Sequence, residues 1–179
     1  WQYALLKSEW TDRADFQRIA ALPVRFDGFM DVPELSDGEI RLICVKKDPA
    51  EPEKERVPMY TFAVTRGGET VGEICLRIGY HLPRLYHGGQ IGYGIDAAYR
   101  GRGYAGRACR LLIPVMRYHG METAFITNNT DNLASRRVCE KLGAQFLRVS
   151  RVPEWHDMYE RGARYVNIFE WRFCEDTPV

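Results

Sequence analysis

A change of hydrophobic period between residues 59 and 118 restricts the fold more than any other feature of the sequence. Apolar residues alternate with other residues in MYTFAVT (59–65) and in TVGEICLRIGY (70–80), and RGGE joins the two runs. A Gly-rich turn between two alternating runs predicts a β-hairpin. QIGYGI (90–95) predicts another strand, whereas residues 104–118 repeat apolar side chains at the spacing of a half-buried helix. The order of these elements indicates a mixed α+β fold.

Weaker patterns extend the assignment to the rest of the chain. Helices are predicted at TDRADFQRIAAL (11–22), with Thr11 or Asp12 as cap, and at LASRRVCEKLG (133–143). Pro114 should kink the helix at 104–118. Further strands are predicted at EIRLICVKK (39–47), TAFIT (123–127), AQFLRVS (144–150) and RYVNIFEWRF (164–173). Loops are expected at 48–58, 81–89 and 152–164.

The length and charge of the chain limit its partners. A chain of 179 residues fits a single domain that spans residues 1–179. Lys and Arg number 25 and Asp and Glu 24, so the net charge of +1 predicts neither a nucleic-acid nor a membrane partner. No apolar run reaches the roughly 18 to 20 residues of a membrane span, and the first residues do not resemble a signal peptide.

The cysteines indicate a reducing compartment. The five of them, an odd number, form no C-x-x-C pair, and no His stands at the spacing of a zinc ligand set. The sequence therefore predicts free thiols, no metal, and a cytoplasmic location.

The segment between the strand at 90–95 and the following helix is suited to bind an anion. Three glycines occur within Arg100–Gly106, and a helix begins at the end of this segment. Backbone N–H groups in such a turn, together with the positive end of a helix, attract phosphate. Five arginines and no acidic residue lie between Ala97 and Met121. The alternative is a Gly-rich turn surrounded by solvated arginines.

Two motifs together resemble the GCN5-related N-acetyltransferase (GNAT) family. YRGRGYA (99–105) resembles the pattern [Q/R]-x-x-G-x-[G/A] that this family uses to bind the pyrophosphate of acyl-CoA. NLASRRVCEKLGA (132–144) resembles its second motif, N-x-x-S followed by a helix that ends in E-K-x-G. The match covers residues 59–150 and is nearest to the branch that resembles ribosomal-protein N-terminal acetyltransferases.

The resemblance implies a mixed, largely antiparallel sheet that opens beside the strand at 90–96, where acetyl-CoA binds as co-substrate without a metal. The implied activity is transfer of the acetyl group to a primary amine of a small molecule or of a peptide or protein N-terminus. The resemblance also implies a set of cofactor-binding residues, several through backbone N–H groups: Ile95, Asp96, Ala97, Arg100, Gly101, Arg102, Gly103, Tyr104, Ala105, Gly106, Asn132 and Ser135.

Three residues are candidates for the proton transfers of this reaction. Glu73 lies in mid-strand on the face opposite Ile74 and Leu76, and it is the candidate general base; a surface carboxylate paired with Arg is the alternative. Many family members place Tyr seven residues after the motif Asn, where this chain has Cys139. Ser135 is therefore the expected hydrogen-bond donor to the cofactor sulfur, and Asn132 is expected to order the cofactor arm or a water. Ser135 could instead bond back to a helix carbonyl.

The acceptor is expected to contact Arg77 and the basic, aromatic segment that follows it, from which Tyr80, His81 and Arg84 are the candidates.

Two other functions stay open. A module that binds acyl-CoA without catalysis would fit Cys139, and an RNA-binding protein would use the same arginines with stacking aromatics. The sequence leaves the acyl chain length, the acceptor and the oligomeric state open, with a homodimer as one option.

Overall fold

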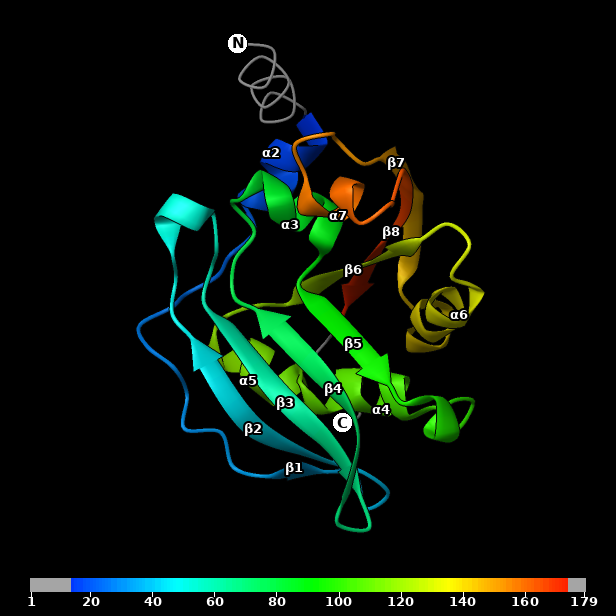
Figure 1. The fold of residues 1–179 in the computed structure, drawn as a ribbon. Coiled ribbons are helices and arrows are strands. Elements are labelled where there is room, and N and C mark those ends of the chain that lie inside the picture. Colours follow the sequence, from blue (N-terminus) through cyan, green and yellow to red (C-terminus); the bar gives the residue numbers. More distant parts are fainter. Residues whose placement is uncertain (1–13, 174–179) are drawn as a thin grey trace.

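The computed structural model describes residues 14–173, which form one eight-stranded sheet with helices on both sides (Figure 1). The strands, in sheet order, are β1 (Leu35–Ser36), β2 (Arg41–Asp48), β3 (Met59–Arg66), β4 (Glu69–Arg77), β5 (Ile91–Ile95), β6 (Thr123–Asn129), β8 (Tyr165–Arg172) and β7 (Gln145–Arg151). The helices are α2 (Ala14–Ala20), α3 (Pro83–Gly88), α4 (Tyr104–Leu111), α5 (Ile113–Tyr118), α6 (Leu133–Leu142) and α7 (Asp157–Glu160). Short 3₁₀ turns occupy Pro52–Lys54 (η1) and Ala97–Tyr99 (η2).

The sheet opens between β5 and β6. Every other neighbouring pair is antiparallel, whereas β5 and β6 are parallel and meet at one pair of residues, Ile91 and Ile126. Gln90 ties the two strands together just before this point, because its backbone N–H donates to the Phe125 carbonyl at 2.8 Å and its side chain accepts from the Phe125 N–H at 2.8 Å. Beyond this contact the strands diverge (Figure 1). The predicted largely antiparallel sheet, open beside the strand at 90–96, is confirmed.

The core lies between the sheet and the helices α4 and α5, which run behind β2 to β5 in Figure 1. On β4, Ile74 and Leu76 are fully buried, while Glu73 on the opposite face is exposed. This alternation confirms the predicted hairpin of β3 and β4. The predicted kink at Pro114 is a break between two helices, with Leu112 outside both and Pro114 in the first turn of α5.

Two predicted loops contain helices. Residues 83–88 form α3, which begins at a proline and buries Leu85, Tyr86 and His87. Residues 157–160 form α7, in which the His156 side chain accepts a hydrogen bond from the Met158 N–H. Both predictions were wrong because tertiary packing and side-chain capping stabilise helices too short to show a hydrophobic period.

The N-terminal prediction is confirmed in part. A helix is present at Ala14–Ala20, while the proposed cap at Thr11 or Asp12 lies outside the described residues. Within residues 14–173, no helix combines the length and apolar character that a membrane span requires. Cys44, Cys75, Cys109 and Cys139 are free thiols, and Cys174 lies outside the described part of the chain.

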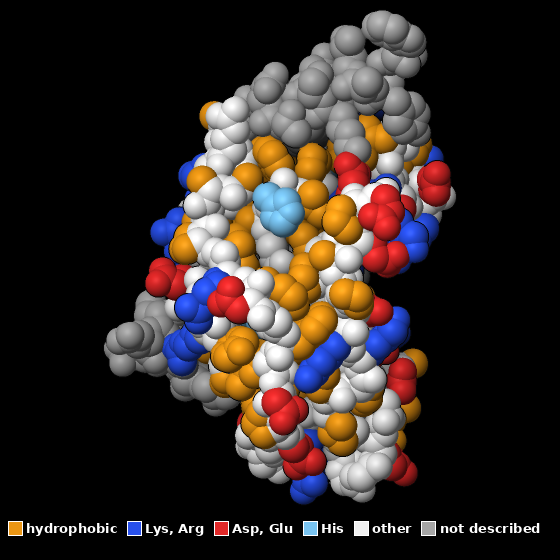
Figure 2. Space-filling model, turned by 90° about the vertical axis from the view of Figure 1, so that its left-hand side faces the viewer, with side chains coloured by type: hydrophobic (Ala, Val, Ile, Leu, Met, Phe, Trp, Pro, Cys, Tyr) orange, Lys and Arg blue, Asp and Glu red, His pale blue; other side chains and the backbone are white. Residues whose placement is uncertain are grey.

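The β2 end of the sheet exposes several hydrophobic side chains. Ile43 and Val45 of β2 are 42% and 57% exposed, and Phe26 is 37% exposed. Figure 2 shows this side of the molecule, where hydrophobic side chains form a band with charged side chains at its margins. None of these three residues lines either of the cavities described below.

Candidate active site

The divergence of β5 and β6 opens a cavity of about 1020 Å³. One wall combines the strands and the helix that border the opening: Ile91, Gly92 and Tyr93 from β5, Thr127, Asn128 and Asn129 from β6, and Asn132 and Ser135 from the start of α6. The other walls come from β2, β3, β4, η1, α3 and α7. After Ile91, the backbone groups of β5 that point away from β4 have no strand partner, so they can bind an extended ligand.

Two hydroxyl groups meet in this cavity. The Tyr93 hydroxyl lies 2.9 Å from Ser135 Oγ, at hydrogen-bond distance, and joins β5 to α6 across the opening. Burial raises the pKa of Tyr93 well above its usual value, so the pair is protonated at neutral pH. The sequence analysis missed Tyr93, because its alternation with Ile91 and Ile95 indicates a core position. Tyr93 nevertheless lines the cavity, and its hydroxyl contacts Ser135.

Asn132 caps helix α6, since its side-chain oxygen accepts a hydrogen bond from the Ser135 N–H at 3.0 Å. This cap fixes the first turn, on which Ser135 stands. The Asn132 side chain also lines the large cavity, so its expected role in ordering the cofactor arm or a water stays a prediction beside its role as the cap that holds Ser135 in place.

Cys139 lies behind this wall and not on it. The residue is fully buried, and the Asn128 side-chain amide donates to its sulfur at 3.8 Å. Burial raises the pKa of the Cys139 thiol to about 12. A buried thiol outside the cavity is poorly placed to give its proton to a ligand.

The Gly-rich segment can hold a phosphate. Gly101 and Gly103 have positive φ angles of 77° and 81°, and a Cβ at either position would meet nothing within 4 Å. Gly103 ends the turn at the N-terminus of α4, where the first N–H groups of a helix lack internal partners. The residues present therefore fit the pyrophosphate of acyl-CoA.

The arginines of this segment differ in their partners. Among residues 14–173, no carboxylate pairs with Arg100 or Arg102, whereas Arg107 pairs with Asp37 at 2.7 Å. Tyr104, Ala105 and Gly106 are buried, so they can contribute only backbone groups. Of the three N–H groups expected at Ile95 to Ala97, that of Asp96 donates to the Val71 carbonyl at 3.0 Å. This bond removes Asp96 from the expected set of backbone donors.

Glu73 lines a second cavity, of about 550 Å³. Other residues that line it are Gly94, Ile95, Ala97 and Arg100. In the sheet Glu73 stands opposite Gly94, on the same face as Cys75 and Arg77. The structure therefore places Glu73 beside the cofactor end of β5 and does not bring it into the cavity that contains Ser135.

The four candidate acceptor residues separate into two groups. Arg77 and Arg84 line the large cavity, whereas Tyr80 and His81 do not. Tyr80 is 1% exposed, and its hydroxyl donates to the Thr123 carbonyl inside the core. His81 is exposed to solvent. The expectation that Tyr80 contacts the acceptor is corrected to a structural role.

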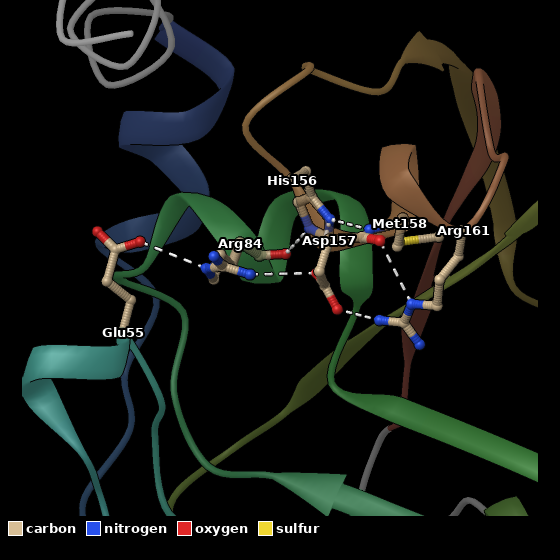
Figure 3. Close-up of polar contacts among 6 residues, drawn as sticks. All are labelled: Glu55, Arg84, His156, Asp157, Met158 and Arg161. Carbon is tan, nitrogen blue, oxygen red and sulfur yellow. Dashed lines mark hydrogen bonds and ion pairs between the residues drawn. The ribbon is translucent and has the colours of Figure 1, made fainter.

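A polar network forms the wall opposite β5. Figure 3 shows its members: Glu55, Arg84, His156, Asp157, Met158 and Arg161. Arg84 pairs with Glu55 at 3.4 Å and with Asp157 at 3.1 Å, and Asp157 also pairs with Arg161. Burial lowers the pKa of His156, whose Nε2 lies 3.0 Å from the Arg84 carbonyl. The network ties α3, α7 and the segment after η1 together.

A comparison with models of protein families identifies the family of this chain. A family model described as an acetyltransferase (GNAT) domain matches residues 5–145. The chain belongs to the GNAT acetyltransferase family. This membership confirms the resemblance, and with it an acyl-CoA-dependent N-acetyltransferase whose co-substrate is acetyl-CoA. No curated protein matches the sequence.

Solved structures of GNAT proteins share the fold. The ribosomal L7/L12 α-N-protein acetyltransferase RimL, in complex with coenzyme A, has a TM-score of 0.59 at 12% identity, over 79% of this chain and 98% of its own. A structure from Vibrio cholerae described as a putative ribosomal-protein-serine acetyltransferase has a TM-score of 0.59 at 14% identity, over 82% and 100%. The microcin C7 self-immunity acetyltransferase MccE, in complex with acetyl-CoA and AMP, has a TM-score of 0.51 at 16% identity, over 68% of this chain and 63% of its own.

Proposed function

We propose that this GNAT protein transfers the acetyl group of acetyl-CoA to a primary amine, either of a small molecule or of a peptide or protein N-terminus, within a ternary complex. The observation that carries the proposal is the opening beside β5, which has the loop Arg100–Gly106 at one end and the Tyr93–Ser135 pair on its wall. RimL and the structure from Vibrio cholerae, both named for ribosomal-protein acetylation, support a peptide or protein acceptor.

Each group of residues has a role in this proposal. Acetyl-CoA, when bound, supplies a thioester that an amine can attack directly. The N–H groups of Arg102 to Gly106, with the side chains of Arg100 and Arg102, bind the pyrophosphate. Ser135, held by the Asn132 cap and supported by the Tyr93 hydroxyl, donates a hydrogen bond to the departing sulfur. Glu73 lines the neighbouring cavity on the same face of β4 as Arg77, and it takes a proton from the acceptor ammonium through intervening water.

An amine acceptor fits the cavity better than a hydroxyl acceptor. A hydroxyl needs a strong base beside it, typically a His oriented by a carboxylate. His156, beside Asp157, is the one His that lines the large cavity, and its Nδ1 accepts from the Met158 N–H. Its Nε2 therefore carries the proton and donates to the Arg84 carbonyl. Both ring nitrogens are occupied, so His156 has no free lone pair for a substrate hydroxyl.

A thiol-release assay with acetyl-CoA tests the proposal. The purified protein should release coenzyme A in the presence of amines or peptide N-termini and much less with matched alcohols, with the acetylated product identified by mass spectrometry. Calorimetry with coenzyme A runs in parallel. Binding of coenzyme A without turnover of any amine would favour the alternative, a non-catalytic module that binds acyl-CoA.

Replacing Cys139 by alanine should change kcat by no more than about twofold, because the thiol lies behind the cavity wall and its raised pKa makes it a weak acid. Steady-state kinetics with the best amine measures the effect. A crippled Cys139→Ala enzyme that retains its melting temperature and its affinity for coenzyme A would transfer the role of proton donor from Ser135 to Cys139.

A cytoplasmic location is part of the proposal. The four cysteines of the described residues are free, and a reducing compartment keeps thiols in that state. Acetyl-CoA is the co-substrate in the same proposal, so the enzyme needs a compartment that supplies it.

A further inference from the structure

We propose that the acceptor amine carries an anionic group, a carboxylate or a phosphate, and that Arg77 binds this group. The inference rests on the proposed function, because it names the class of amine that the same cavity accepts. It makes Arg77 a specificity-determining residue of the reaction.

Arg77 stands at the end of the opening that is remote from the cofactor phosphates. It is the last residue of β4, and its N–H donates to the Gln90 carbonyl at 2.9 Å, just before β5 begins. The phosphate-binding segment Arg100–Gly106 follows the other end of β5. Five residue steps of about 3.3 Å lead from Gln90, the backbone partner of Arg77, to Ile95 at the other end of β5, a distance of roughly 16 Å. An anion at Arg77 is therefore a group of the acceptor and not of coenzyme A.

Arg77 differs in charge pairing from the other cations of the cavity. Five other basic side chains line it, and each pairs with a carboxylate: Lys46, Lys54, Arg56, Arg84 and Arg161. Arg77 makes no ion pair with a carboxylate of residues 14–173, and its side chain donates a long hydrogen bond, 3.4 Å, to the Gly89 carbonyl. A half-buried guanidinium has five donors and favours a planar, bidentate anion.

The fold directs this guanidinium into the opening. A Cβ placed on Gly92 would lie 3.1 Å from the Cys75 sulfur and 3.6 Å from an Arg77 guanidinium nitrogen. Gly92 thus leaves room for the Arg77 side chain over the backbone of β5, next to the point where β5 loses β6. Arg77, Tyr93 and Ser135 all line the large cavity, so an acceptor bound there can contact both this charge and the Tyr93–Ser135 pair.

A carboxylate oxygen on the same face as Arg77 lacks a hydrogen-bond partner. Asp48, Met59 and Arg77 stand opposite one another on β2, β3 and β4, and all three line the cavity. Asp48 Oδ1 pairs with Lys46 at 2.9 Å, whereas Asp48 Oδ2 is buried and has no hydrogen-bond partner. A buried carboxylate oxygen without a partner destabilises the protein unless a ligand donates to it. An acceptor with both an N–H donor and an anion, such as an acidic peptide or an amino acid, satisfies both residues.

Matched pairs of acceptors test the inference. The pairs are short peptides with Glu or Gln at the second position, and a small amine with a free carboxylate against its amide; a phosphoserine peptide against its serine peptide separates phosphate from carboxylate. The wild-type enzyme should favour the anionic member of at least one pair by about 10-fold or more in kcat/KM. Arg77→Gln should remove this preference through KM, with kcat and the turnover of neutral amines little changed.

Arg56→Gln is the matched control, because Arg56 lines the same cavity but pairs with Glu51, and it should keep the preference. The inference would be overturned if Arg77→Gln lowered kcat/KM equally for anionic and neutral amines, or if the wild-type enzyme showed no preference for anionic amines. Either result would leave the proposed function intact. Absence of turnover with every amine would contradict the proposed function itself, and the inference with it. Unchanged affinity of Arg77→Gln for coenzyme A shows that the variant is folded.

Discussion

Replacing Gly103 by valine should weaken the binding of coenzyme A by about 100-fold or more and reduce turnover accordingly. Gly103 has a φ of 81°, in the left-handed region, which a β-branched residue enters only with strain. Valine would therefore turn the chain away from this conformation and move the first N–H groups of α4 out of their common direction. Isothermal titration calorimetry with coenzyme A measures the loss.

Gly120→Val is the matched control for this prediction. Gly120 also has a positive φ, 69°, with nothing within 4 Å of an added Cβ, but it lies between α5 and β6, away from both cavities. This variant should lose stability by a similar amount in thermal unfolding and bind coenzyme A within about twofold of the wild type. Equal affinities of the two variants for coenzyme A would remove the Gly-rich turn from the cofactor site.

The parts of the fold that the sequence predicted well have strong local patterns. Alternation in β3 and β4 and the period of α4 are visible within a few residues, because one face of each element is buried. The helices α3 and α7 are short, and their stability comes from partners distant in sequence, as in the Arg84–Asp157 pair, 73 residues apart. No local pattern reports such a contact.

The same distinction between local patterns and contacts distant in sequence explains which residues of the site could be predicted. The glycines and Ser135 could be found from two motifs, whereas the Tyr93–Ser135 contact joins residues 42 apart in the chain. Tyr80 was misassigned because the alternation of β4 ends at Arg77, yet the chain carries Tyr80 back into the core, where its ring packs edge-on against Phe125. The unpaired state of Arg77 could be recognised only after the partners of the neighbouring cations were known.

Replacing Ser135 by alanine should lower kcat by about 100-fold, with a smaller effect on the affinity for coenzyme A. The hydroxyl acts on the departing sulfur, whose charge develops only in the transition state, so its loss affects the chemical step more than binding.

Glu73→Gln should lower kcat by a similar factor, because glutamine has nearly the same shape but cannot accept the ammonium proton. Stopped-flow or single-turnover kinetics with the best amine separates the chemical step from product release.

The pH dependence of kcat distinguishes the two roles. If Glu73 is the base, the pH profile of kcat differs between the wild-type enzyme and Glu73→Gln, because glutamine cannot accept the ammonium proton. Burial raises the pKa of Tyr93, and a raised pKa favours the protonated hydroxyl, so the Tyr93–Ser135 donor stays protonated as the solution becomes alkaline. The profile of kcat should therefore show no fall up to about pH 10, the usual pKa of tyrosine. A fall well below this pH that disappears in Tyr93→Phe would mean that the pair ionises and would remove it as the proton donor.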